Sequence, residues 1–361
     1  MALEAIGSHW LHPDRELHGR RSCALELVYL RGAEGGDFDP EGLSERVAVA
    51  RSKGVDVWVR VDLQSQAVLP AVGNEAGVLE YIQAVQQIVA ENDIRGIICG
   101  NEVNLHSETG GVDLPAAWVA RVVYGHGLDP SRNDCAYSFA KAARPSIQVL
   151  APPLAPWAAA PYAASGDRTG LTPPDGRVAV GDWEAYQYEL ARRCYDNAGH
   201  VPDPLDVQFA VHTYGRVGAD GSDNGGAREP WTDVRIQDEG WFGAQAGSRW
   251  LQDAIYYIRQ GRLNSPDGTD ESPSILISEA NTLTEGHQPQ NNYPAGWWKE
   301  LARYADTFPN VMGLCAFVDQ GLSDEWMRTS MSVPEGNLVA WNADHDDLLK
   351  NGWGAPATIT A

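Results

Sequence analysis

Two glutamates of this chain each follow a short run of apolar residues. Ile97-Ile98-Cys99-Gly100 leads into Asn101 and Glu102, and Ile275-Leu276-Ile277 leads through Ser278 into Glu279. Short apolar runs bounded by turn residues are typical of buried strands in parallel sheets. A carboxylate at the end of such a strand must be hydrated, paired or used, because burying it alone is costly in free energy.

Two carboxyl groups that face each other could cleave a glycosidic bond. One of them, as the acid, protonates the leaving oxygen, while the other, ionised, attacks the sugar or activates water. Their surroundings must therefore drive the two pKa values apart. The chemistry is possible only if the fold brings together two residues that are far apart in the chain.

Eight strand-like runs, most of them separated by amphipathic stretches, would have to position these groups. The strands are expected at Ala5–Trp10, Ala24–Leu30, Val55–Asp62, Ile94–Asn101, Ile147–Pro152, Asp206–Tyr214, Ser274–Glu279 and Val311–Asp319. Helical spacing of apolar residues occurs over 41–52, 76–90, 115–144, 182–196, 248–260 and 295–306, with a final helix and loose end over 340–361. This alternation predicts an α/β protein, with a parallel sheet that closes into a (β/α)8 TIM barrel.

The length of the chain fits a single barrel domain over residues 1–361. A typical barrel needs about 250 residues, so roughly 100 are left for loops. We expect long loops after the fifth and sixth strands, at 153–181 and 215–247, which are rich in Gly, Pro or Asp. An open doubly wound sheet is the alternative fold, but the chain has neither a GxGxxG turn nor a P-loop.

In a TIM barrel, the carboxyl ends of the strands share one face. The residues gathered there would be Arg60, Asn101, Glu102, His212, Tyr214, Glu279 and Asp319. Strands four and seven lie on opposite sides of the ring, so Glu102 and Glu279 could meet across its mouth. A single strand-end glutamate is better interpreted as the partner of an arginine, but two at these positions favour catalysis.

The order of these motifs resembles the retaining glycoside hydrolases of clan A over roughly residues 5–350. That family carries its acid/base on strand four and its nucleophile on strand seven. Asn101-Glu102 is similar to its Asn-Glu pair, in which Glu is the acid/base and Asn binds a sugar hydroxyl. Ser278-Glu279 is similar to its nucleophile motif. His212-Thr213-Tyr214 resembles its His-x-Tyr, in which the Tyr contacts the nucleophile.

Other positions resemble the family less closely. Trp326 follows strand eight, where the family often places a Trp beneath the cleaved sugar. Val103 stands where the family often has Pro, and Arg60 falls on the third strand rather than the second. Arg60 could hold Glu279 ionised, or it could simply offset buried charge.

The aromatic and histidine candidates each have an alternative interpretation in the core. Trp58 alternates with Arg60 and so shares its strand face, where it could line the cavity or pack in the interior. Trp10, at the end of the first strand, could stack on a sugar. His212 could be a core histidine, whereas Tyr214 is the better site candidate because a phenol can donate to a carboxylate.

Composition limits the classes of partner. A net charge of −22 argues against nucleic acid and anionic lipid and suits a neutral or cationic substrate, although it also simply favours solubility. No apolar run reaches membrane-spanning length, so we expect no membrane insertion. The N-terminus lacks the pattern of a secretory signal, and location stays open between cytoplasm, export, and a phage or cell-wall role.

No metal and no cofactor are expected, because HExxH, His-x-His and CxxC are absent and the five cysteines lack metal-ligand spacing. The leading hypothesis is a retaining glycoside hydrolase acting on an oligo- or polysaccharide, with Glu279 as nucleophile and Glu102 as acid/base. A carbohydrate-binding barrel without catalysis is one alternative, and a metal-dependent barrel hydrolase is another. The sugar, endo or exo action and the oligomeric state are open.

Overall fold

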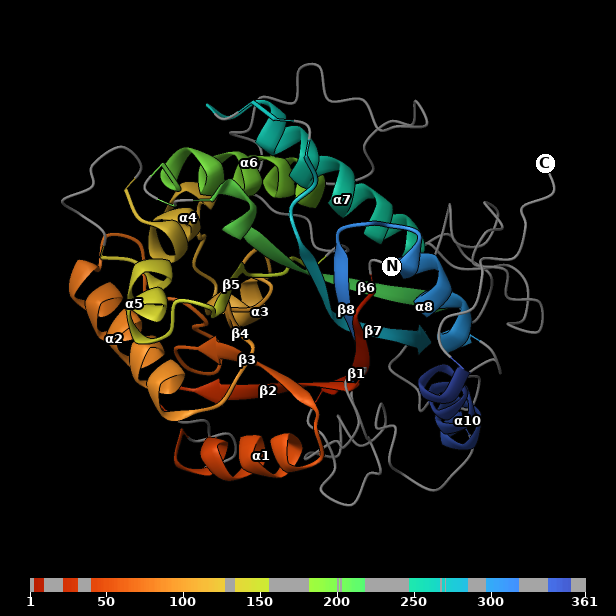
Figure 1. The fold of residues 1–361 in the computed structure, drawn as a ribbon. Coiled ribbons are helices and arrows are strands. Elements are labelled where there is room, and N and C mark those ends of the chain that lie inside the picture. The colour runs from red at the N-terminus through yellow and green to blue at the C-terminus, as the bar shows by residue number, and fades with distance from the viewer. Residues whose placement is uncertain are drawn as a thin grey trace.

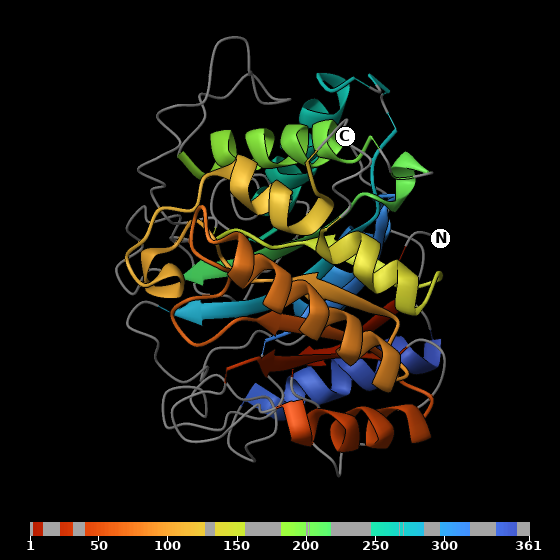
Figure 2. The same cartoon turned by 90° about the vertical axis from the view of Figure 1, so that its left-hand side faces the viewer.

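Eight parallel strands form a closed barrel, in the order β1 to β8. The computed structural model describes residues 3–9, 22–31, 40–126, 134–155, 182–199, 201, 203–217, 247–266, 268–269, 271–284, 297–317 and 337–351. The strands are β1 (Ala5–His9), β2 (Ser22–Tyr29), β3 (Asp56–Asp62), β4 (Gly96–Cys99), β5 (Gln148–Ala151), β6 (Gln208–Val217), β7 (Ile275–Thr284) and β8 (Val311–Ala316). This confirms the predicted (β/α)8 fold, and Figure 2 shows the strands running in one direction.

The helices surround the barrel (Figure 1). They are α1 (Pro40–Ser52), α2 (Glu75–Glu91), α3 (His106–Thr109), α4 (Ala116–Tyr124), α5 (Ala136–Ala143), α6 (Asp182–Asn197), α7 (Gly247–Leu263), α8 (Trp297–Asp306) and α10 (Asn337–Asn351). The single helical stretch predicted over 115–144 is wrong, because its described residues form two separate helices, α4 and α5. Gly125 ends α4 with a φ of 90°, a conformation that glycine adopts readily, and its N–H donates to the Arg121 carbonyl.

The inside of the barrel holds its own apolar cluster, separate from the larger one between strands and helices. Every strand contributes to it, and its members are Ala5, Cys23, Leu25, Trp58, Ile98, Leu150, Ala210, Leu276, Met312 and Cys315. Gly7 of β1 pairs with Cys23 on one side and Cys315 on the other. All five cysteines are buried, and none of them forms a disulfide.

The pairing of β6, β7 and β8 is irregular next to the expected site. The β6–β7 register shifts between Val211 and His212, and the β7–β8 register shifts between Ile277 and Ala280. Such irregularities re-aim side chains. The prediction that the seventh strand ends at Glu279 is wrong, since β7 continues to Thr284 and Glu279 lies within it.

Most of the two predicted long loops, 156–181 and 218–246, lies outside the described residues. The described start of the first, 152–155, follows β5, and β6 extends to Val217, beyond its predicted end at Tyr214. Among the described residues, none of the helices combines the length and the apolar character needed to cross a membrane.

Candidate active site

Glu102 reaches the mouth of the barrel through a tight turn after β4. Gly100 has a φ of 86°, which its lack of a Cβ permits, and its N–H donates to the Val61 carbonyl over 3.0 Å. Glu102 itself has a φ of 33°, which is uncommon for a residue with a side chain. Strained backbone of this kind gathers at functional sites, where the surrounding structure holds it in place.

A further contact fixes the segment behind Glu102. The Asn104 side chain donates to the Ala155 carbonyl over 2.9 Å and accepts from the Ala155 N–H over 2.8 Å. This double hydrogen bond ties the turn after β4 to the segment after β5. Glu102 is therefore aimed by two neighbouring strands and not by its own turn alone.

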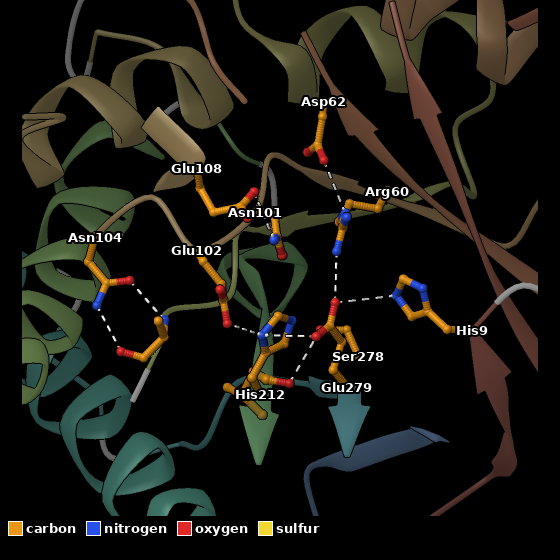
Figure 3. A network of polar contacts seen from close by, with 12 residues as sticks. His9, Arg60, Asp62, Asn101, Glu102, Asn104, Glu108, His212, Ser278 and Glu279 are labelled. Carbon is orange, nitrogen blue, oxygen red and sulfur yellow. Dashed lines mark hydrogen bonds and ion pairs between the residues drawn. The ribbon is translucent and has the colours of Figure 1, made fainter. Parts of the chain in front are cut away.

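Glu102 and Glu279 both approach the same atom, Nδ1 of His212 (Figure 3). The Glu102 Oε1 atom lies 2.9 Å from it, and the Glu279 Oε2 atom lies 3.5 Å from it. One oxygen of each glutamate and the ring nitrogen all lie within 4.8 Å of one another. All three residues are buried. Two glutamates 177 positions apart in the sequence thus become neighbours.

The surroundings of Glu102 favour its protonated form. The pKa of Glu102 is raised to about 8, mainly by burial and also by the negative charge of Glu108, while Arg60 acts in the opposite direction. Burial disfavours the ion because the low-dielectric interior solvates charge poorly. At neutral pH Glu102 is therefore a carboxylic acid that can donate a proton.

Glu279 lies against a fixed positive charge. Nη1 of Arg60 donates to Glu279 Oε1 over 2.8 Å, and Nε of Arg60 lies 3.2 Å from Asp62 Oδ2. Burial opposes the charge of Arg60, but Asp62 and Glu279 raise the pKa of its guanidinium above the ordinary value. A permanently charged guanidinium favours the ionised form of a carboxylate in contact with it.

Asp62 completes this ion-pair chain at the end of β3. It is fully buried, and burial raises its pKa to about 7 although Arg60 acts in the opposite direction. The order Asp62–Arg60–Glu279 places one positive charge between two carboxyl groups (Figure 3).

Two neutral histidines flank Glu279. Burial lowers the pKa of His212 to about 4, although Glu279 raises it, and burial lowers the pKa of His9 well below its ordinary value. Nε2 of His9 lies 3.6 Å from Glu279 Oε1, and its ring packs edge-on against Phe317. Since His212 is neutral, its 2.9 Å contact with Glu102 is a hydrogen bond and not an ion pair.

The structure brings together five of the predicted site residues, which are Arg60, Asn101, Glu102, His212 and Glu279. Tyr214 lies on β6 opposite Asn281, and its side chain is outside the described part of the chain. Trp10, Trp326 and Asp319 also lie outside the described residues.

The prediction that Trp58 contacts substrate is wrong. Its ring is fully buried in the inner cluster, where Nε1 donates to Gln148 Oε1 over 3.0 Å. The Arg95 guanidinium lies 4.9 Å from the centre of the Trp58 ring. Gly96 leaves room for this ring, because a Cβ there would lie 2.7 Å from it. Trp58 fills the barrel at the level of the strand N-termini, below Arg60.

Three residues of the site were not predicted, namely His9, Asp62 and Glu108. Asp62 alternates with Trp58 and Arg60 along β3, so the same period of two could have identified it. His9 ends β1, one residue before the predicted site residue Trp10. Glu108 lies on the short helix α3, and no sequence signal indicates its position.

Glu102, His212 and Glu279 could also hold a metal ion, because each offers one ligand atom within the 4.8 Å cluster. Carboxylate and imidazole ligands of this kind suit zinc and other divalent ions. The sequence contains none of the metal-binding motifs considered above, so it did not indicate this set of ligands. The Arg60 guanidinium would lie beside any ion bound there.

No family model matches the chain, and no curated protein matches it. Among solved structures, a glucosidase from Croceicoccus marinus matches 93% of this chain and 64% of its own, with 12% identity and a TM-score of 0.50. A fungal β-1,4-galactanase matches 90% of this chain and 87% of its own, with 10% identity and a TM-score of 0.47. An endo-1,4-β-mannanase from Eisenia fetida matches 96% and 91%, with 12% identity and a TM-score of 0.45. At these identities the likeness shows the fold alone.

Proposed function

We propose that the protein is a glycoside hydrolase that retains the configuration of the sugar it cleaves. The observation that carries this proposal is the convergence of Glu102 and Glu279, with carboxyl oxygens within 4.8 Å, on one ring nitrogen of His212. Retaining enzymes hold their carboxyl groups about 5 to 5.5 Å apart, whereas inverting enzymes leave roughly 6.5 to 9.5 Å for a water molecule. The short separation supports direct attack by one glutamate.

The environments of the two glutamates support distinct roles. In the first step, a Glu279 oxygen bonds to the anomeric carbon while the glycosidic C–O bond breaks, and the leaving oxygen takes the proton of Glu102. In the second step, the Glu102 carboxylate takes a proton from water, the water oxygen bonds to the anomeric carbon, and the bond to Glu279 breaks. The raised pKa of Glu102 suits the acid role.

His212 and Arg60 would position the two reacting groups. Neutral His212 holds Glu102 through its 2.9 Å contact without adding a positive charge that would ionise the acid. Arg60 holds Glu279 Oε1 and leaves Oε2 on the side of His212 and Glu102. We propose an oligo- or polysaccharide as the substrate.

Glu279→Gln tests the nucleophile. Against a panel of aryl glycosides, we expect the variant to lose several orders of magnitude in kcat relative to wild type. Glu80→Gln is the matched control, because Glu80 lies on α2 with a side chain that is 60% exposed and pairs only with Arg31 among the described residues. Equal turnover by wild type and Glu279→Gln would reject Glu279 as nucleophile.

Glu102→Ala tests the acid/base. With an activated aryl leaving group, the first step needs little acid, so the glycosyl-enzyme forms and waits for a base. Added azide needs no base, and we expect it to restore turnover and release a glycosyl azide of retained configuration, seen by NMR. A folded variant that azide does not rescue would contradict the assignment.

The metal-capable cluster keeps a metal-dependent barrel hydrolase as the second candidate. The two functions differ in one measurement, the activity after dialysis against a chelator and after addition of zinc or manganese. We expect turnover by the retaining enzyme to survive the chelator. Loss with the chelator and recovery with one ion would favour the metal-dependent function, and binding of glycans without any turnover would favour a carbohydrate-binding barrel.

A further inference from the structure

A third carboxyl group, that of Glu108, stands beside the catalytic pair and has no part in the two steps above. Glu108 lies on α3 and is partly buried. Its negative charge is one of the causes that raise the pKa values of Glu102 and Asp62, so it acts within the site. Among the described residues, no basic side chain lies within ion-pair distance of it.

Asn101 connects Glu108 to the reacting centre and presents an unused acceptor. Nδ2 of Asn101 lies 3.3 Å from Glu108 Oε2, which fixes the orientation of the amide. The other amide atom, Oδ1, is buried and has no hydrogen-bond partner within the described part of the chain. Figure 3 shows this oxygen on the side of the amide away from Glu108. A buried acceptor of this kind calls for a donor from a ligand.

The other charges near Asn101 are already balanced. Arg60 lies between Glu279 and Asp62, and His9 and His212 are neutral because burial lowers their pKa values. The positive charge of Arg60 is thus already shared by Glu279, Asp62 and Glu108, in a chain whose net charge is −22. A group bound next to Asn101 meets acceptors and negative charge. An ammonium offers three donors and no acceptor, whereas a hydroxyl offers one donor.

We propose that the substrate is an amino sugar, whose ammonium donates to the Asn101 amide oxygen and is attracted by the negative charge of Glu108. This inference rests on the proposed hydrolase function. Asn101 directly precedes Glu102, which must reach the glycosidic oxygen. The ring substituent nearest to Asn101 is then the one on the carbon beside the anomeric carbon, so the amino group belongs at that position. A charged hydrogen bond in a desolvated site gives both affinity and selectivity.

Paired substrates test this directly. Each pair consists of two 4-nitrophenyl glycosides that differ only in a hydroxyl or an amino group beside the anomeric carbon, in the gluco, galacto and manno series. We expect wild type to prefer the amino member at least tenfold in kcat/KM in one series. Glu108→Gln should reduce that preference about 10-fold, because it removes the negative charge that attracts the ammonium.

Asp113→Asn is the matched control, since Asp113 follows α3, is exposed and pairs with His106. It removes one negative charge from the same segment, and the preference should stay within about twofold of wild type because exposed charges are screened. A preference for the hydroxyl member, or a preference that Glu108→Gln leaves unchanged, would overturn the inference while leaving the hydrolase function intact.

Failure of the hydrolase function gives a different result, because no glycoside of either kind would then be cleaved. Calorimetric titration with glucosamine and glucose oligosaccharides would still decide the subsite. Tighter binding of the glucosamine oligosaccharide that Glu108→Gln weakens at least tenfold supports an ammonium site. Equal binding of both, or of neither, overturns it.

Discussion

At the scale of single residues, Asp62 acts on the chemistry through its contact with Arg60. The guanidinium is planar, so its Nε edge at Asp62 and its Nη1 atom at Glu279 are fixed relative to each other. Holding one edge therefore orients the donor that faces Glu279. Asp62 is a positioning residue, since no part of it contacts the carboxyl pair directly.

Asp62→Asn should lower kcat about 10- to 100-fold and leave KM within about twofold, the usual size of effect when a group that orients a catalytic donor is lost. The amide keeps the shape of the side chain but removes the charge that holds Arg60. Asp56→Asn is the matched control at the other end of β3, where Asp56 pairs with Arg51 and Arg95. Steady-state kinetics on an aryl glycoside measures both constants. An unchanged kcat would mean that Arg60 is held by other contacts.

The sequence indicated which residues would lie together where reactive side chains and strand ends coincided. Glu102 and Glu279 were recognisable because each follows an apolar run. A carboxylate buried there must be paired or serve a function, since burying it alone is costly in free energy. How far a residue lies from the mouth of the barrel was not predictable in the same way. Trp58 and Arg60 share a face, but two residues along a strand separate the packed interior from the mouth. Only the register between strands, which depends on the whole barrel, sets that depth.

At the scale of elements, β1 lies between β2 and β8 and leaves no room for a side chain at Gly7. A Cβ at Gly7 would lie 1.6 Å from the Cys23 carbonyl oxygen and 3.0 Å from Cys23 Sγ. The Sγ atoms of Cys23 and Cys315 lie 3.7 Å apart across this strand. The missing side chain of Gly7 lets the two sulfur atoms meet over it.

Gly7→Ala should therefore lower the free energy of unfolding by about 3 kcal/mol or more, because the clash is with backbone and cannot be relieved by a rotamer change. Gly42→Ala in α1 is the contrasting variant. A Cβ there meets only the flexible end of Arg46, and alanine favours helix by up to about 1 kcal/mol. Urea unfolding measures both. Equal effects of the two substitutions would contradict the close approach of β1.

The elements themselves were predictable because apolar runs and helical spacing alternate along the chain. Their ends near the site were not. The register shifts at His212 and after Ile277 arise from pairing between β6, β7 and β8, so local sequence carries little signal for them. The helix α3 has only four residues, too few for a periodic pattern to indicate, yet it carries Glu108.

At the scale of the whole molecule, the buried site groups make stability depend on pH in two directions. Glu102 and Asp62 have folded pKa values of about 8 and about 7, above their ordinary values of 4.5 and 3.8. The stability they contribute is complete below those ordinary values and is lost as pH rises through the folded ones. His212 has a folded pKa of about 4, below 6.5, so its contribution is complete above 6.5 and is lost as pH falls to about 4.

Below pH 6.5 the two effects oppose each other, and above it only the carboxyl groups act, so stability should fall between pH 6.5 and about 8. Glu102→Gln cannot ionise and should lose less stability over that interval than wild type. The difference should be about 2 kcal/mol, from 1.36 kcal/mol per pH unit over roughly 1.5 units. Urea unfolding of both proteins at pH 6.5 and 8.5 measures it, with Glu80→Gln expected to follow wild type. Parallel slopes for wild type and Glu102→Gln would show that another group ionises there. Burial would then not be the reason that Glu102 keeps its proton at neutral pH.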